Sequence, residues 1–200
     1  MSSHAEVVPL TSESVTPGLV VAVTALLDDL VVSGAALGWV TPPDADEVSE
    51  LLHSVAVAAG RGDAYCAIVY GTPSRSDRVA QASAPASAGQ IGGFGYWLRY
   101  RRATHQPHAD LPHLAIAQSL QGRGLGGLML DHLVGDARTA GLEQLTLDCR
   151  ADNVRAQALW RSRGFVEYGR LPDFVAVGDQ RYDKTLWVLD LRADLTGQTG

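Results

Sequence analysis

Residues 121–127 form a glycine-rich segment, QGRGLGG, whose composition suits the binding of an anion. Glycine lets the backbone come close to a ligand, and the N–H groups at the start of a helix point toward negative charge. Arg123 lies inside the segment and can add charge-assisted hydrogen bonds. The segment therefore predicts a site for a phosphate or pyrophosphate group.

Three phosphate-binding motifs compete for this segment. A Walker A loop needs a lysine after its last glycine, and residues 121–127 contain none. The dinucleotide pattern GxGxxG is present as Gly122, Gly124 and Gly127. However, only about 75 residues follow, too few for the usual doubly wound sheet. The third motif, Q/R-x-x-G-x-G/A, is matched by Gln121, Gly124 and Gly126.

The elements around this segment alternate between strands and helices, which predicts an α/β fold with a mixed sheet. Residues 71–89 are rich in Ser, Ala, Gly and Pro and indicate a flexible insertion. Apolar periodicity and capping residues predict helices over 17–32, from Asp44 or Asp46 to 59, 125–140, and from Asp152 or Asn153 to 163. The expected strands cover 6–10, 64–70, 91–101, 111–117, 142–148, 165–170 and 183–191.

Length and charge limit the classes of protein that remain. Two hundred residues suit one domain covering 1–200, and the net charge of −6 argues against nucleic acid or an anionic membrane as partner. The apolar run 19–27 is too short to span a bilayer and follows no basic residue, so we expect a cytoplasmic protein. Cys66 and Cys149, in apolar strands, are expected to be packing thiols.

The chain resembles the GCN5-related N-acetyltransferase (GNAT) family over residues 90–190. Besides the third glycine motif, the resemblance rests on the preceding strand and on a block in the second half of the chain. The matching residues are Leu114, Ala115, Ile116, Asp148, Asn153, Ala156, Leu159, Trp160, Gly164 and Phe165. The segments Gly34–Trp39 and Gly169–Phe174 are similar to those of the tabtoxin-resistance group of small-molecule acetyltransferases.

The resemblance implies the GNAT fold, a mostly antiparallel mixed sheet of six or seven strands with about four helices. The sheet would be splayed at its centre, between strands 111–117 and 142–148, and acetyl-CoA would lie in the opening. Its pyrophosphate would contact the segment Gln121, Gly122, Arg123, Gly124, Leu125, Gly126 and Gly127. Its pantetheine would run beside Leu114, Ala115 and Ile116, with Asn153, Ala156 and Trp160 completing the cofactor site.

The resemblance also implies roles in the chemistry. Asp148 matches the position of a general base, and a carboxylate there can take a proton from an amine, anchor an ammonium group or be purely structural. Trp160 stands where the family commonly has a tyrosine general acid, and indole is not a useful acid. Tyr168, Tyr182 or water can replace it. An acyl-enzyme on Cys149 is a minor alternative.

The N-terminal third is the region over which the substrate enters in relatives. Residues 1–60 hold eight acidic side chains and no Lys or Arg, so we predict a small cationic amine, such as an antibiotic or specialised metabolite. Asp28, Asp29 and Trp39 are the candidate substrate contacts. Alternatives are an acyl-CoA-binding regulatory module, a peptide or protein N-acetyltransferase and a nicotinamide-dependent oxidoreductase.

Two further expectations concern metals and partners. His105, His108 and His113 are close in sequence, but no carboxylate or thiol completes a metal site, so no metal is expected. The resemblance implies that a homodimer is possible, although no surface pattern in the sequence requires a dimer.

Overall fold

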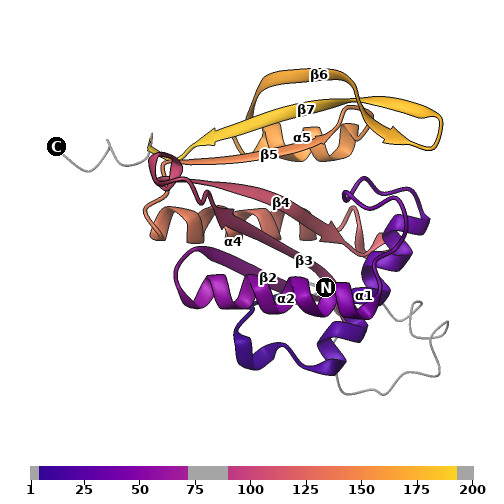
Figure 1. Cartoon of the computed structure of the whole chain (residues 1–200), viewed down its shortest axis with the longest axis vertical. Coiled ribbons are helices and arrows are strands. Elements are labelled where there is room, and N and C mark those ends of the chain that lie inside the picture. The colour runs from indigo at the N-terminus through magenta and orange to yellow at the C-terminus, as the bar shows by residue number, and fades with distance from the viewer. Residues whose placement is uncertain (1–4, 72–89, 193–200) are drawn as a thin grey trace.

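The computed structural model describes residues 5–71 and 90–192, so residues 72–89 of the predicted insertion lie outside it. The described residues form a seven-stranded sheet and four α-helices (Figure 1). The sheet order is β1-β2-β3-β4-β5-β7-β6. The strands are β1 Glu6–Pro9, β2 Ala64–Gly71, β3 Gln90–Arg99, β4 His108–Ile116, β5 Gln144–Arg150, β6 Val166–Val177 and β7 Gln180–Asp190. The helices are α1 Pro17–Val32, α2 Ala45–Gly60, α4 Leu125–Thr139 and α5 Val154–Ser162.

The sheet is split at its centre, between β4 and β5. All neighbouring strands in the described sheet are antiparallel except this pair, which is parallel. Pairing runs only from His108 opposite Gln144 to Asp110 opposite Thr146. Both strands then continue, to Ile116 and Arg150, without pairing to each other. The predicted GNAT architecture is confirmed, and a doubly wound parallel sheet is excluded.

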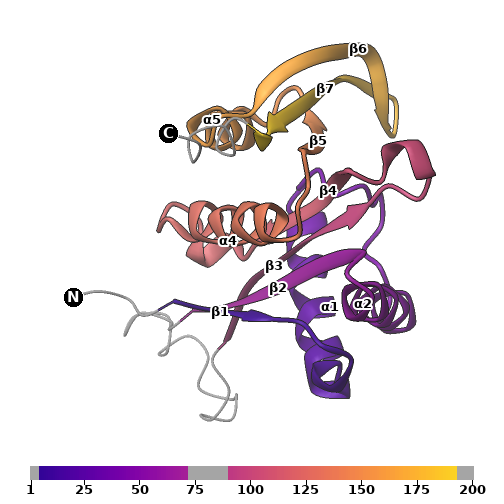
Figure 2. The same ribbon diagram turned by 90° about the vertical axis from the view of Figure 1, so that its left-hand side faces the viewer.

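Helices cover both faces of the sheet. Figure 2 shows α4 and α5 on one face and α1 and α2 on the other. The helices α1, α2 and α4 each bury one apolar stripe, as expected from the 3.6-residue period. The buried stripes include Val23, Leu27 and Leu30 of α1, Val48, Leu52 and Val55 of α2, and Met129, Leu130 and Leu133 of α4.

Local capping explains where the helices begin. The Thr16 hydroxyl accepts a hydrogen bond from the Leu19 amide at 3.2 Å, and Pro17 occupies the first position of α1, where its missing N–H costs nothing. Of the alternatives in the sequence, Asp44 caps α2 and Asn153 caps α5. Each accepts a hydrogen bond from the backbone three residues on, which satisfies a free N–H group.

Several predicted strand limits are wrong. β4 begins at His108 rather than Leu111, because residues 108–110 pair with β5 and residues 109 and 110 also pair with β3. The last two strands form a longer hairpin than expected, with β6 reaching Val177 and β7 starting at Gln180. A register shift between Leu171 and Val175 interrupts this hairpin, and Asp173 there has a left-handed φ of 53°. Such an irregularity hides the period-2 pattern that reveals a strand in sequence.

No helix in the described ranges is long and apolar enough to cross a membrane.

Candidate active site

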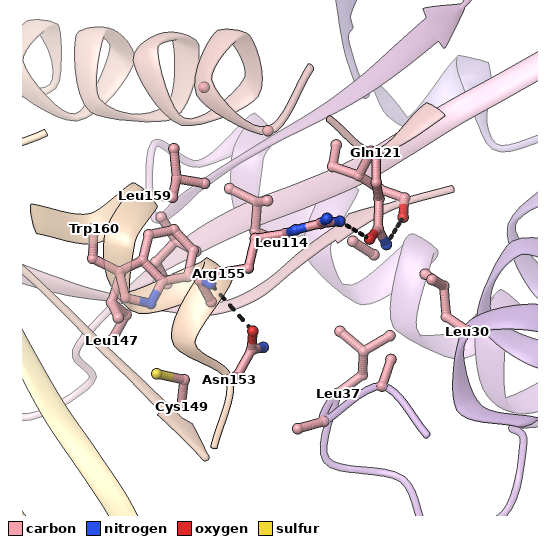
Figure 3. Close-up of a pocket in the computed structure, with 18 of the residues that line it drawn as sticks. Leu30, Leu37, Leu114, Gln121, Leu147, Cys149, Asn153, Arg155, Leu159 and Trp160 are labelled. Atoms are coloured by element: carbon pink, nitrogen blue, oxygen red, sulfur yellow. Dashed lines mark hydrogen bonds between the residues drawn. The ribbon is translucent and has the colours of Figure 1, made fainter. Parts of the chain in front are cut away.

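A cavity of about 360 Å³ lies in the opening between β4 and β5. Its walls come from the α1–α2 connection, β4, the glycine segment, β5 and α5. Figure 3 shows Trp160 and Leu159 of α5 across the cavity from Leu30 and Leu37. Twelve of the predicted cofactor and catalytic residues line it: Leu114, Ala115, Ile116, Gln121, Gly122, Gly124, Gly126, Gly127, Asp148, Asn153, Ala156 and Trp160.

The glycines of segment 121–127 meet different physical needs. Gly122 and Gly124 have left-handed φ angles of 77° and 83°, which favour glycine, and Gly124 is the residue before α4 begins. Gly126 is needed for close approach, since an added Cβ would lie 3.3 Å from Leu159 Cδ2 and 3.8 Å from Ile116 Cγ1. At Gly127 the nearest group to an added Cβ would be the Arg163 guanidinium, the end of a flexible side chain that can move away. The segment thus opens the start of α4 to the cavity.

Gln121 connects the two sides of the opening. Its amide Nε2 donates to the Ile116 carbonyl at 3.1 Å, at the end of β4. Its Oε1 accepts from Nη1 of Arg155, on α5, at 2.8 Å (Figure 3). Sequence reasoning missed Arg155, which lines the cavity and brings a positive charge to the glycine segment. Its place in the first turn of α5, two residues after the Asn153 cap, is the only sequence signal.

Two residues predicted to bind the cofactor lie outside the cavity lining. Leu125 is 7% exposed and packs its side chain into the core under α4. Arg123 is an exposed residue at the start of this helix. The predicted contact of Leu125 with a ligand is therefore restricted to its backbone.

Trp160 and Asn153 form part of the cavity wall on the α5 side. The Asn153 Oδ1 accepts from the Ala156 amide at 3.1 Å, which leaves its amide N–H groups as the donors for a ligand. Trp160 is 6% exposed, and its indole N–H is buried without a hydrogen-bond partner in the described structure. Because that N–H is covered by protein, Trp160 offers the cavity an apolar ring and no donor.

Asp148 lies on the cavity wall and carries an ion pair that the sequence analysis did not foresee. Its Oδ2 is 2.8 Å from Nζ of Lys184, a residue of β7. The side chain of Asp148 is 45% exposed and that of Lys184 is 24% exposed. The antiparallel register places Lys184 opposite Arg150, two residues beyond Asp148 on β5. The negative charge of Asp148 at the cavity wall is therefore balanced by the positive charge of Lys184.

A second acidic residue, Asp110, lies at the last paired position before the split. The Thr146 hydroxyl donates to Asp110 Oδ1 at 2.6 Å, and the Tyr100 hydroxyl is 2.6 Å from the same Thr146 oxygen. Burial raises the pKa of Asp110, the bond from Thr146 opposes this, and the nearby charge of Asp148 adds to the increase. Asp110 and Asp148 thus form an acidic pair that Lys184 partly neutralises.

The predicted substrate contacts are not in the lining. Asp28 and Asp29 are exposed on α1, and no wall of the cavity includes them. Trp39 is half-buried, donates from Nε1 to Glu47 Oε1 at 2.8 Å, and packs its ring 4.8 Å from that of His113. Trp39 therefore supports the connection between α1 and α2, on which the lining residues Ala35, Ala36 and Leu37 lie.

His113 holds that connection against β4. Its Nε2 lies 3.1 Å from the Leu37 carbonyl, and its Nδ1 lies 2.9 Å from the Tyr96 hydroxyl. Burial lowers the pKa of His113, while the Leu37 carbonyl opposes this. The neutral imidazole donates to Leu37 and accepts from Tyr96.

In the described part of the chain, no three His, Cys, Asp or Glu residues form a metal site.

Cys149 also lines the cavity, with its Sγ 3.3 Å from the Thr185 hydroxyl. Successive residues of a strand point to opposite faces of the sheet, so Asp148 and Cys149 point apart. Asp148 is therefore not placed to activate this thiol. Cys66 is fully buried, and burial raises its pKa, which makes it an inert thiol.

Comparison with known proteins identifies a matching family. Residues 82–165 match the model of the acetyltransferase (GNAT) family. Over 59 residues the chain is 42% identical to the [ribosomal protein bS18]-alanine N-acetyltransferase of Salmonella typhimurium, covering 30% of this chain and 40% of that protein. Over 83 residues it is 32% identical to the Escherichia coli K12 protein of the same name, covering 42% and 56%. The matches span about half the length of these curated relatives.

Solved structures share the fold. An acetyltransferase of the GNAT family from Streptococcus pneumoniae superimposes with a TM-score of 0.72, at 16% identity, over 94% of this chain and 99% of that one. A GNAT superfamily phosphinothricin acetyltransferase from Sinorhizobium meliloti, solved in complex with acetyl-CoA, gives 0.70 at 17% identity, over 95% and 89%.

Proposed function

We propose that this chain, a member of the GNAT family, is an acetyl-CoA-dependent N-acetyltransferase that acts on the amine of a small molecule. The observation that carries the proposal is the cavity at the split of β4 and β5, which joins the glycine segment to Asp148. An anion site and a proton acceptor on one cavity are what transfer from a phosphate-bearing thioester to an amine requires.

The residues around the cavity suit acetyl-CoA. The start of α4, opened by Gly122 and Gly124, would take the pyrophosphate, with Arg155 adding positive charge. Beyond Asp110, the edge of β4 that faces β5 has no strand partner, so residues 114–116 can pair with the extended amides of pantetheine. When bound, acetyl-CoA supplies an activated acyl group as a thioester.

The chain's own groups then act on the acceptor. A backbone N–H of the 114–117 segment would polarise the thioester carbonyl, a contact of the oxyanion-hole kind. Asp148 would take a proton from the incoming ammonium group, or hold that group beside the cavity. Because an alkylamine has a pKa of about 10.4, it needs this deprotonation at neutral pH. Without an acceptor, Lys184 forms an ion pair with Asp148.

The departing thiolate needs little assistance. Trp160 offers no donor to the cavity, and the acid of a thiolate has a pKa of about 8.5 by analogy with cysteine. Such a thiolate can leave unprotonated at a modest cost in rate. The apolar indole would instead pack against the bound donor.

A small amine is the acceptor that we favour. The cavity volume of about 360 Å³ must also hold part of the donor, and the connection at Ala35–Leu37 forms part of its wall. The similarity of Gly34–Trp39 to the tabtoxin-resistance group agrees with this assignment. Transfer to the N-terminus of a protein is the second candidate, supported by the matches to bS18-alanine N-acetyltransferases.

An acceptor screen that follows thiol release separates these functions. The panel holds polyamines, amino acids, aminoglycosides and peptides with an N-terminal alanine. We expect the highest kcat/KM with a small amine, at least about tenfold above any peptide. A reversed order would assign the chain to protein N-acetylation. Binding of acetyl-CoA without turnover of any acceptor would favour the regulatory module.

A further inference from the structure

Lys184 is the single lysine of the chain. Fifteen of the sixteen basic residues are arginine, and arginine serves the ion pairs at Asp131, Asp152, Glu167 and Asp190. A guanidinium stays protonated at any working pH, whereas an ammonium group can lose a proton and become a nucleophile. The one side chain that can accept an acetyl group on nitrogen is therefore at position 184.

The position of this amine matches that of an acceptor. Lys184 Nζ lies 2.8 Å from Oδ2 of Asp148, and Asp148 lines the cavity. The centroid of the Phe174 ring, on β6, lies 5.4 Å from the same nitrogen. With 24% of its side chain exposed, Lys184 is confined near the opening instead of extending into solvent.

The ion pair leaves this amine free to react. Asp148 is 45% exposed, and a pair so open to solvent is held weakly, so the ammonium group can separate from the carboxylate and return. In the proposed function, Asp148 also takes the proton from the ammonium group of the acceptor. The same contact that holds Lys184 can therefore deprotonate it.

We propose that Lys184 is itself acetylated on Nζ by bound acetyl-CoA when no other acceptor is present. This inference rests on the proposed function. Asp148 takes one proton from the ammonium group, and the neutral Nζ attacks the thioester carbonyl. The N–C bond forms, the C–S bond breaks, and the departing sulfur takes the second amine proton as CoA thiol. Asp148 then releases its proton to water.

Acetylation changes the site that produced it. The amide at position 184 has no charge, so Asp148 loses the cation that lies 2.8 Å from its Oδ2, and Asp110 loses the nearby charge that lowers its pKa. The added acetyl group also occupies space beside Asp148. A chain kept with acetyl-CoA alone should therefore lose activity toward an external amine, whereas a chain supplied with that amine should be protected.

Mass spectrometry on the whole chain tests the inference. The protein is incubated with acetyl-CoA alone, and acetyl groups are located by peptide mapping. Arg61→Lys places a lysine at an exposed position at the end of α2, so uncatalysed acetylation is measured in the same molecule. We expect Nζ of Lys184 to be acetylated about a hundredfold faster than the introduced amine. Asp148→Asn should remove most of that difference, and denaturation should remove all of it.

Each result decides the inference. Equal rates at the two lysines, or an undiminished rate in Asp148→Asn, would overturn it. If acetyl-CoA raises the melting temperature and an external amine is acetylated while Lys184 stays unmodified, the inference fails and the proposed function stands. If acetyl-CoA produces no melting shift and no transfer to any amine, both fail.

Discussion

At the scale of single residues, Asp148 carries the greatest part of the proposed chemistry. Asp148→Asn keeps the shape of the side chain and removes its capacity to accept a proton. We expect kcat/KM for the amine acceptor to fall by about a hundredfold near neutral pH, with acetyl-CoA affinity unchanged. A steady-state pH profile measures this, with Asp190→Asn, on the exposed end of β7, as the matched control. An unchanged kcat/KM and an unchanged profile would exclude both the base and the anchor role.

Trp160 is a second residue whose role can be isolated. Trp160→Phe removes a buried N–H that has no partner, and relief of that donor offsets the loss of packing volume. We expect the free energy of unfolding to change by less than about 1 kcal/mol. Trp187 is the matched control, because its Nε1 donates to Thr185 at 2.9 Å.

Urea denaturation compares the two variants. Trp187→Phe should be less stable than Trp160→Phe by about 1–2 kcal/mol, since it leaves a buried hydroxyl without its donor. Equal losses would mean that the Trp160 indole N–H has a hydrogen-bond partner in the folded chain.

At the scale of elements, the start of α4 must lie open to the donor. A side chain at Gly126 would fill the space between Leu159 and Ile116, whereas an added Cβ at Gly135, later on the same helix, meets nothing within 4 Å. We expect Gly126→Val to weaken acetyl-CoA binding at least about tenfold, which corresponds to about 1.4 kcal/mol. Gly135→Val should bind as the parent does. Calorimetric titration measures the acetyl-CoA affinity of both variants. Equal affinities would mean that acetyl-CoA does not bind at the start of α4.

His113 joins two elements, β4 and the α1–α2 connection. Burial lowers its pKa, so the folded state keeps it neutral while the unfolded state takes up a proton below pH about 6.5. Stability from this residue is therefore full above that pH and decreases as the pH falls toward the folded pKa. Between pH 7.5 and 5.5 the free energy of unfolding of the parent should therefore fall by more than that of His113→Gln. His132→Gln, exposed on α4, should behave as the parent. Identical losses in all three would contradict a buried neutral imidazole.

The same elements show what a single sequence can predict. The glycine segment was predictable, and the caps of α2 and α5 were each narrowed to two residues, because turn conformation and capping are local properties. The twelve lining residues were expected from the resemblance to the GNAT family. The contacts of Lys184 with Asp148, Arg155 with Gln121 and His113 with Leu37 join residues 36, 34 and 76 positions apart. No local pattern encodes which distant side chains meet, so these partners required the structure.

At the scale of the whole molecule, the split sheet determines what binding should do. One part holds β1 to β4 with α1, α2 and α4, and the other holds β5 to β7 with α5. Besides the short β4–β5 pairing, contacts such as the two hydrogen bonds from Arg163 to Asp131 join α5 to α4. A ligand in the opening touches both parts. It should therefore stabilise the entire chain. Sedimentation equilibrium would determine whether the chain forms the homodimer that the family resemblance allows.

The most direct test of the central claim is the melting temperature with saturating acetyl-CoA, CoA or NAD. A ligand at 100 times its Kd stabilises the folded state by about 2.7 kcal/mol, or roughly 5–10 °C for a chain of this size. We predict a rise of this order with acetyl-CoA and with CoA and none with NAD. A rise with NAD alone, or no rise with either CoA species, would contradict the assignment of the cavity between β4 and β5 to acetyl-CoA.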